Sequence, residues 1–159
     1  MSDPQADEAF RKSICTQPPG RGRVRSETDS LGVREVPVDA YWGVNVSRAL
    51  ENFAISGRPI SVYSDFIYAY ACVKQAAALA NADLGAMERW KAELIERACV
   101  EIREGSLHDQ FVVDIMQGGA GTSTNMNMNE VIANRGLELA GRPKGDYAYL
   151  DPNDHANRG

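Results

Sequence analysis

Two consecutive helical patterns place the strongest limit on how this chain can fold. After Pro59, apolar residues recur at spacings of three and four, with Ser61 as a candidate cap, and this predicts a helix that ends near Leu84. A second helix is predicted from about Met87 to Glu104, with Gly105 as its stop. The short connection and the opposed apolar stripes predict an antiparallel helix pair. The predicted stripes are Phe66, Tyr70, Val73, Ala77 and Ala80 in the first helix, and Trp90, Leu94, Ile95, Cys99 and Ile102 in the second.

A third helix is predicted after a glycine-rich loop. It begins near Asn125 and ends at Leu139-Ala140, where Gly141 and Pro143 stop it. Residues 145–159 are rich in turn-forming residues. The chain is therefore expected to be mainly α-helical.

The N-terminal part of the chain gives a weaker signal. Residues 1–24 are predicted to form a disordered tail, because Pro18-Pro19-Gly20 cannot lie inside a helix and no apolar period is sustained there. Residues 25–59 form an irregular opening segment with many large apolar residues and a short helical stretch around Ser47 to Phe53. Such a segment usually needs another surface to lie on.

Composition narrows the function classes. The 159-residue chain has a net charge of −5, which disfavours broad attraction to nucleic acid or to anionic lipid. No apolar run approaches the ~20 residues of a membrane-spanning helix, and no secretory signal is recognisable at the start. The three cysteines, Cys15, Cys72 and Cys99, have no CxxC spacing, which fits a reducing cytoplasm and offers no zinc site. We therefore expect a soluble cytoplasmic protein without a metal site.

The most informative stretch for chemistry is the loop of residues 118–124. Its three glycines let the backbone adopt positive φ and approach a ligand, and the helix behind it offers free N–H groups and a positive dipole end. The hydroxyls of Thr122, Ser123 and Thr124 add side-chain donors. This pattern suits a small anion such as a carboxylate or phosphate. The alternative is an ordinary glycine loop with Thr122 or Ser123 as the N-cap. A nucleotide-phosphate loop does not fit, because no Lys follows the glycines.

Two further polar clusters have simple structural interpretations. Asn125, Asn127 and Asn129 at a helix start can serve in capping, in buried polar contacts or with a ligand. The run from Asp151 to His155 could be an acid–base or metal cluster, although no second His or Cys lies at ligand spacing. The alternative is an Asx turn with Pro at its second position. His108 has no neighbour in sequence that suggests chemistry.

Several long motifs in order resemble the class II fumarase/aspartate ammonia-lyase superfamily, from residue 25 to the end of the chain. Those that carry the resemblance are Arg25-x-Glu27-x-Asp29-Ser30-Leu31-Gly32, Glu35-Val36-Pro37, Ala40-Tyr41-Trp42-Gly43, Arg48-Ala49-Leu50-Glu51-Asn52-Phe53, Asp109-Gln110-Phe111, Gln117 to Val131 and Pro152-Asn153-Asp154-His155.

This resemblance implies that residues 25–159 form the helical N-terminal domain of the fumarase/aspartase fold. Ala120 and Ser123 stand where fumarases more often have Ser and Gln, so the chain looks closest to aspartate ammonia-lyases, which convert L-aspartate to fumarate and ammonia. On this resemblance Thr122 binds a substrate carboxylate, Ala120 and Gly121 line the loop, and Asn125 supports it. The resemblance also implies a small dicarboxylate or amino-acid substrate, a homotetrameric parent and no cofactor. The alternatives are a class II fumarase parent, and a non-catalytic remnant that binds a dicarboxylate or a full-length subunit.

The chain also departs from the family pattern. Asp151 and Ala148 replace the His and Arg of a second anion site, of which only Asn153 and Asp154 match, and an Asp there would repel a dicarboxylate. Asn45 and Val46 stand where Gln and Thr are usual. The chain stops before the family's Gln-Ser-(Ser/Thr)-Asn-Asp segment, its Thr-His motif, its serine- and lysine-bearing loop and its central helices. Since each active site in the family combines three subunits, we expect no catalytic residue in this chain and no activity from it alone.

Overall fold

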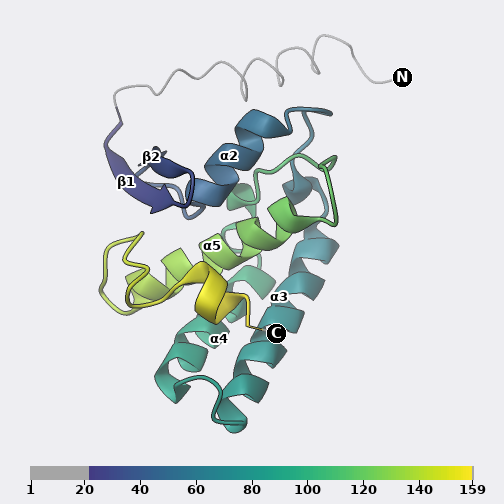
Figure 1. Ribbon diagram of the computed structural model, residues 1–159. Coiled ribbons are helices and arrows are strands. Elements are labelled where there is room, and N and C mark those ends of the chain that lie inside the picture. Colours follow the sequence, from purple (N-terminus) through teal and green to yellow (C-terminus); the bar gives the residue numbers. More distant parts are fainter. Residues whose placement is uncertain (1–21, 159) are drawn as a thin grey trace.

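A computed structural model describes residues 22–158, which are mainly α-helical as predicted (Figure 1). A hairpin of two strands precedes four helices, and short helical turns η1, η2 and η3 connect or follow them. The elements in order are β1 (Val24–Asp29), β2 (Gly32–Pro37), α2 (Val44–Asn52), η1 (Ile60–Val62), α3 (Ser64–Asp83), α4 (Arg89–Arg103), η2 (His108–Gln110), α5 (Thr122–Leu139) and η3 (Pro152–Ala156).

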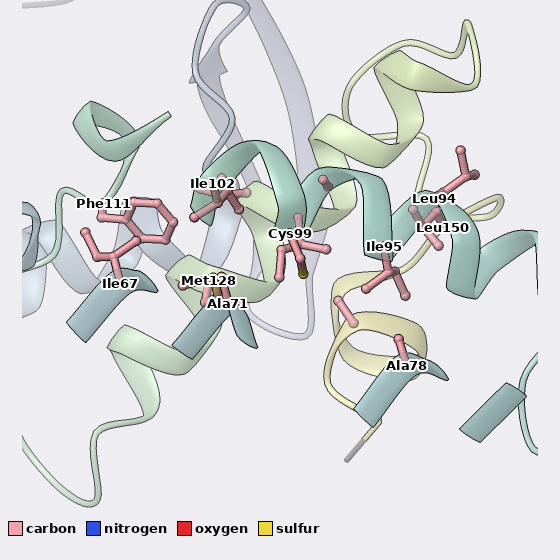
Figure 2. Close-up of a cluster of buried hydrophobic side chains, with 14 of the residues drawn as sticks. Ile67, Ala71, Ala78, Leu94, Ile95, Cys99, Ile102, Phe111, Met128 and Leu150 are labelled. Atoms are coloured by element: carbon pink, nitrogen blue, oxygen red, sulfur yellow. The ribbon is translucent and has the colours of Figure 1, made fainter. Parts of the chain in front are cut away.

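The predicted antiparallel pair is α3 and α4, and α5 packs against it (Figure 1). The core lies where these three helices meet. Phe111 and Leu150, from the segments before and after α5, complete it. Figure 2 shows part of this cluster, with Ile67, Ala71 and Ala78 of α3, Ile95, Cys99 and Ile102 of α4, and Met128 of α5.

The buried face of α3 differs from the predicted one by one position. Ile67, Ala71, Lys74 and Ala78 are buried, whereas Phe66 and Val73 of the predicted stripe are 47% and 60% exposed. Helix α3 is apolar on more than one side, so its period alone cannot select the inner face. The small side chains of Ala71 and Ala78 let α4 approach closely, and packing decides the choice. The start of α3 also differs from prediction, because Ser61 lies in η1 and no side chain caps the helix at Ser64.

The predicted inner stripe of α4 is largely confirmed. Leu94, Ile95, Cys99 and Ile102 are buried, while Trp90 is 38% exposed and packs its ring against that of Tyr149, 4.6 Å between centroids.

The opening segment is more regular than the sequence indicated, because it contains the β1–β2 hairpin. Antiparallel pairing runs from Val24↔Pro37 to Asp29↔Gly32, and Gly32 closes the turn with a φ of 109°. Arg48 of α2 donates two hydrogen bonds of 2.7 Å to the Asp29 carboxylate, which fastens the hairpin to the helix. Most of the predicted tail, residues 1–21, lies outside the described residues, and Val24 already belongs to β1.

Within residues 22–158, no helix combines the length and the apolar character that a membrane crossing requires.

Candidate functional site

The glycine loop has the backbone conformation that its sequence predicts. Gly119 and Gly121 have φ values of 75° and 82°, and Gly121 is the N-cap residue of α5. A Cβ at either position would meet no neighbour within 4 Å, so backbone conformation rather than crowding favours glycine there. Gly118, Gly119 and Ala120 are exposed, and the loop therefore presents its backbone to solvent.

A glutamine, rather than a hydroxyl, caps the helix behind the loop. The Gln117 Oε1 atom accepts a 3.0 Å hydrogen bond from the backbone N–H of Thr124, and Gln117 Nε2 donates to the Thr124 hydroxyl. Neither Thr122 nor Ser123 forms a side-chain cap, so the capping alternative for them is wrong. Local capping rules do not predict this contact, because Gln117 lies seven positions before Thr124.

Capping by Gln117 leaves donors available in the loop. Across the described chain, the backbone N–H groups of residues 119–123 have no hydrogen-bond partner, and the Thr122 side chain is exposed. These groups lie at the N-terminus of an 18-residue helix, where the dipole favours negative charge. The arrangement suits one carboxylate of a small ligand.

Asn125 is held in place on both sides. Its Oδ1 accepts a 2.7 Å hydrogen bond from the Tyr70 hydroxyl, and its Nδ2 donates to Asn157 Oδ1 at 2.8 Å. Burial raises the pKa of Tyr70, which keeps that hydroxyl protonated as a donor. Asn125 therefore joins α5 to α3 and to the C-terminal segment.

The other two asparagines make buried polar contacts and do not cap. Asn127 Oδ1 accepts from the backbone N–H of Val112 at 2.9 Å, and its Nδ2 donates to the Gln110 carbonyl at 2.9 Å. Asn129 Nδ2 donates to Asn157 Oδ1 at 3.1 Å. Met126 and Met128, which alternate with the three asparagines, are buried.

Asp114 fixes the chain just before the glycine loop. Its carboxylate accepts from the Ser56 hydroxyl at 2.6 Å and from the backbone N–H groups of Gly57 and Met116 at 2.8 and 2.7 Å. Burial acts to raise the pKa of Asp114, but these hydrogen bonds outweigh it and the pKa is lowered. Asp114 thus acts as a charged anchor between two loops.

The geometry around Asp151 does not favour the family's second anion site, which the sequence departures at Asp151 and Ala148 already disfavour. Its Oδ1 accepts from the backbone N–H groups of Asn153 and Asp154 at 2.6 and 2.9 Å, so the residue's own carboxylate takes the donors that an anion would need. This is the Asx turn that the sequence suggested. Asn153 also lines a surface cleft of about 460 Å³, together with Arg48, but the Arg48 guanidinium is already paired with Asp29.

The two histidines have structural surroundings. His108 Nε2 lies 2.8 Å from the Ile102 carbonyl. His155 Nδ1 accepts from the backbone N–H of Asp151 at 2.8 Å, and burial together with the nearby Lys91 ammonium lowers the pKa of His155. Among residues 22–158, no group of three His, Cys, Asp or Glu side chains is arranged to hold a metal ion.

Sequence reasoning missed a pair of buried carboxylates at the start of α2. Glu130 accepts hydrogen bonds from the backbone N–H groups of Gly43 and Asn45 at 2.7 and 2.8 Å, and Glu27 accepts from Val44 N–H at 2.8 Å and from the Tyr147 hydroxyl at 3.0 Å. Burial raises the pKa of Glu130. Asn45, one of the departures from the family pattern, donates its side-chain amide to Glu130 at 2.9 Å. A lone Glu inside a polar helix segment gives no sequence signal for this role.

Comparison with known proteins identifies close relatives. A family model described as a lyase matches residues 32–159. The chain is 54% identical over 136 residues to the aspartate ammonia-lyase of Escherichia coli strain K12, covering 85% of this chain and 28% of that protein. It is 50% identical over 135 residues to the aspartate ammonia-lyase of Helicobacter pylori. That match covers 85% of this chain and 29% of the relative.

Solved structures of the same kind share the fold. A fumarate lyase:delta crystallin of Brucella melitensis, bound to cobalt, superposes with a TM-score of 0.84 at 51% identity. The match covers 85% of this chain and 29% of that one. The class II fumarase of Schistosoma mansoni gives a TM-score of 0.74 at 34% identity, covering 85% and 28%. The chain thus spans less than a third of the length of these relatives.

Proposed function

The chain belongs to the lyase family whose model matches residues 32–159, and from this membership we propose that it is the N-terminal part of an aspartate ammonia-lyase. The proposed parent reaction eliminates ammonia from L-aspartate and forms fumarate. The identity of 50–54% to proteins named aspartate ammonia-lyase, against 34% to a class II fumarase, supports this choice. Ala120 and Ser123 in the glycine loop point in the same direction.

The observation that carries the proposal is the set of free donors at the start of α5. In the elimination, a base removes a proton from the carbon next to a carboxylate, and negative charge gathers on the carboxylate oxygens. The C–N bond then breaks, the C=C bond of fumarate forms, and ammonia leaves. Donors fixed where that charge develops stabilise the transition state. We assign this role to the Thr122 hydroxyl and the backbone N–H groups beside it, with Ala120 and Gly121 lining the loop and Asn125 supporting it.

The chain alone is proposed to be catalytically inactive. By resemblance to the family, the base and the serine-bearing loop belong to segments that this sequence does not contain. The parent is proposed to act as a homotetramer in the cytoplasm. This chain then supplies one contributor to a composite site, the carboxylate-binding loop.

A chimera tests the proposal directly. Residues 24–159 replace the matching segment of the Escherichia coli aspartate ammonia-lyase, and fumarate formation is followed from L-aspartate and from L-malate. The chimera should act on aspartate, and Thr122→Val should lower kcat/KM about 100-fold by removing a donor to the developing charge. Thr28→Val, on the exposed face of β1, is the matched control and should leave kcat/KM unchanged.

Three results would each contradict part of the proposal. A chimera that turns over malate and ignores aspartate would favour the fumarase alternative. An inactive chimera that still assembles would favour the non-catalytic remnant. Fumarate formed from aspartate by the 159-residue chain alone would overturn the proposed inactivity.

A further inference from the structure

Lys74 is a buried cation in the middle of α3. The residue is 8% exposed, and its Nζ atom lies 3.4 Å from Asn157 Oδ1 of the C-terminal segment. Within residues 22–158, Lys74 takes part in no ion pair: no carboxylate oxygen lies within 4.0 Å of its Nζ atom. Removing an ammonium from water without an opposite charge is costly, so such a lysine calls for an explanation.

The Cys99 thiol of α4 does not supply that charge. Cys99 of α4 interacts electrostatically with Lys74, but burial raises the pKa of the Cys99 thiol to about 12, so it stays neutral at neutral pH. The Tyr70 ring lies beneath the ammonium, 5.6 Å from Nζ to the ring centroid, and gives only a weak cation–π contact.

Too many donors converge on one neutral oxygen beside Lys74. Asn157 Oδ1 accepts from Asn125 Nδ2 at 2.8 Å and from Asn129 Nδ2 at 3.1 Å, and it is also the hydrogen-bond acceptor of Lys74 Nζ, at 3.4 Å. An amide oxygen has two lone pairs, whereas an ionised carboxylate has two oxygens and a full negative charge. The cluster therefore holds an amide where its donors would suit a carboxylate better.

The cluster adjoins the proposed carboxylate-binding loop. Asn125 lies in the first turn of α5, three residues after Thr122 and on the same side of the helix, so the positive end of the helix dipole adds to the charge of Lys74. The C-terminal segment that carries Asn157 passes across α3 at this level (Figure 1). Asn157 itself is exposed, so the cluster reaches the surface.

We propose that Lys74, with the amides of Asn125 and Asn129, forms a carboxylate-binding site. This site is additional to the one proposed for the glycine loop. The carboxylate comes either from a free small dicarboxylate or from an acidic side chain of a longer chain or of another subunit. This proposal rests on the proposed function only in the choice of a dicarboxylate as the free ligand. The test measures stability and binding rather than turnover, so failure of this proposal is distinguishable from failure of the proposed ammonia-lyase activity.

The test places a carboxylate in the site and measures its coupling to Lys74. Asn157→Asp exchanges the amide for an isosteric carboxylate, and Lys74→Met removes the charge while keeping the length of the side chain. In a double-mutant cycle followed by urea unfolding at pH 7, Asn157→Asp should raise the folding equilibrium constant about tenfold more with Lys74 present than in the Met variant. Lys144→Met is the matched control, since Lys144 also lies over a tyrosine ring, that of Tyr41, but near the other end of α5. It should show no coupling to residue 157.

A titration with fumarate and with succinate separates the two sources of the carboxylate. A change in the NMR signal of the Lys74 side chain that Asn157→Asp abolishes identifies a free dicarboxylate as the ligand. No change, with the coupling to Asn157→Asp intact, excludes these free dicarboxylates and favours a protein side chain as the source. Absence of coupling in the cycle would overturn the proposal, and so would an equal response to sulfate, which would show a general cationic pocket.

Discussion

The backbone N–H of Gly43 donates a 2.7 Å hydrogen bond to Glu130 Oε2, across 87 positions of sequence. Gly43 precedes α2, and Glu130 lies in the buried half of α5, so the helix that carries the glycine loop also caps α2. A Cβ on Gly43 would overlap the Glu27 carboxylate and the Tyr147 hydroxyl, which explains why the chain passes this point with a glycine. The hydrogen bond between Gly43 and Glu130 therefore helps to hold α5 against α2.

Glu130→Gln should destabilise the chain by about 2–4 kcal/mol. Glutamine has nearly the same shape, but it replaces one acceptor oxygen by an NH₂ group that faces the N–H groups at the start of α2 and leaves buried donors unpaired. Urea unfolding at pH 7 measures the loss. Glu96→Gln is the control, because within residues 22–158 the Glu96 carboxylate accepts a single side-chain hydrogen bond, from Gln75 at 3.3 Å. This variant should change the free energy of unfolding by less than about 0.5 kcal/mol. Equal effects of the two variants would show that Glu130 does not hold α2.

Gln117→Ala should loosen the first turn of α5. The variant removes the acceptor of the Thr124 N–H, and a lost helix cap costs about 1 kcal/mol. Hydrogen exchange at the Thr124 amide should become faster, while exchange in the middle of α4 should stay slow until global unfolding. Gln117→Glu keeps the acceptor oxygen and should retain most of the protection. An unchanged Thr124 exchange rate in the Ala variant would contradict the assigned capping role.

The helices and the glycine loop could be predicted because their signals are local. The helical periodicity, the glycines at helix ends and the run from Gly118 to Gly121 involve only neighbouring residues. The structure has the predicted helices α4 and α5, and Gly119 and Gly121 have positive φ values. The hairpin was missed although its strands are adjacent in sequence, because no alternating apolar pattern marks them. Glu27 and Val36 are the residues that the hairpin buries, and one of the two is charged.

The candidate site divides in the same way. The loop and Thr122 could be found from sequence, and Asn125 followed from the family resemblance. The donor cluster of Lys74 and Asn157 could not be found, because it joins residues 83 positions apart through side-chain contacts alone. The Gln117 cap likewise replaced the hydroxyl cap that local rules favour.

Helix α3 offers a direct test of which face is the core. Ile67→Ala should destabilise the chain by about 2–4 kcal/mol, because Ile67 is 1% exposed and its truncation leaves a cavity. Val73→Ser, in the stripe that period alone would place inside, should cost less than about 0.5 kcal/mol, because Val73 is 60% exposed. Thermal or urea unfolding of both variants gives the comparison. A larger loss for Val73→Ser than for Ile67→Ala would mean that in solution the other face of α3 is buried.

The pH dependence of stability should carry the signature of Asp114. Its pKa in the folded chain lies below the ordinary value, since the donors from Ser56, Gly57 and Met116 outweigh burial. A lowered pKa means that the unfolded chain binds the proton more readily, so the stabilisation is complete above the unfolded pKa of about 3.9 and is lost as the pH falls through the folded value. The free energy of unfolding should therefore fall more steeply below about pH 4 in the unsubstituted chain than in Asp114→Asn, which should itself be less stable at pH 7.

Urea unfolding at pH 7, 5, 4 and 3 measures both slopes. Asp109→Asn is the control, because Asp109 is an exposed carboxylate that accepts a hydrogen bond from Gln110. Parallel slopes for the unsubstituted chain and Asp114→Asn would show that the anchor before the glycine loop does not depend on the charge of Asp114.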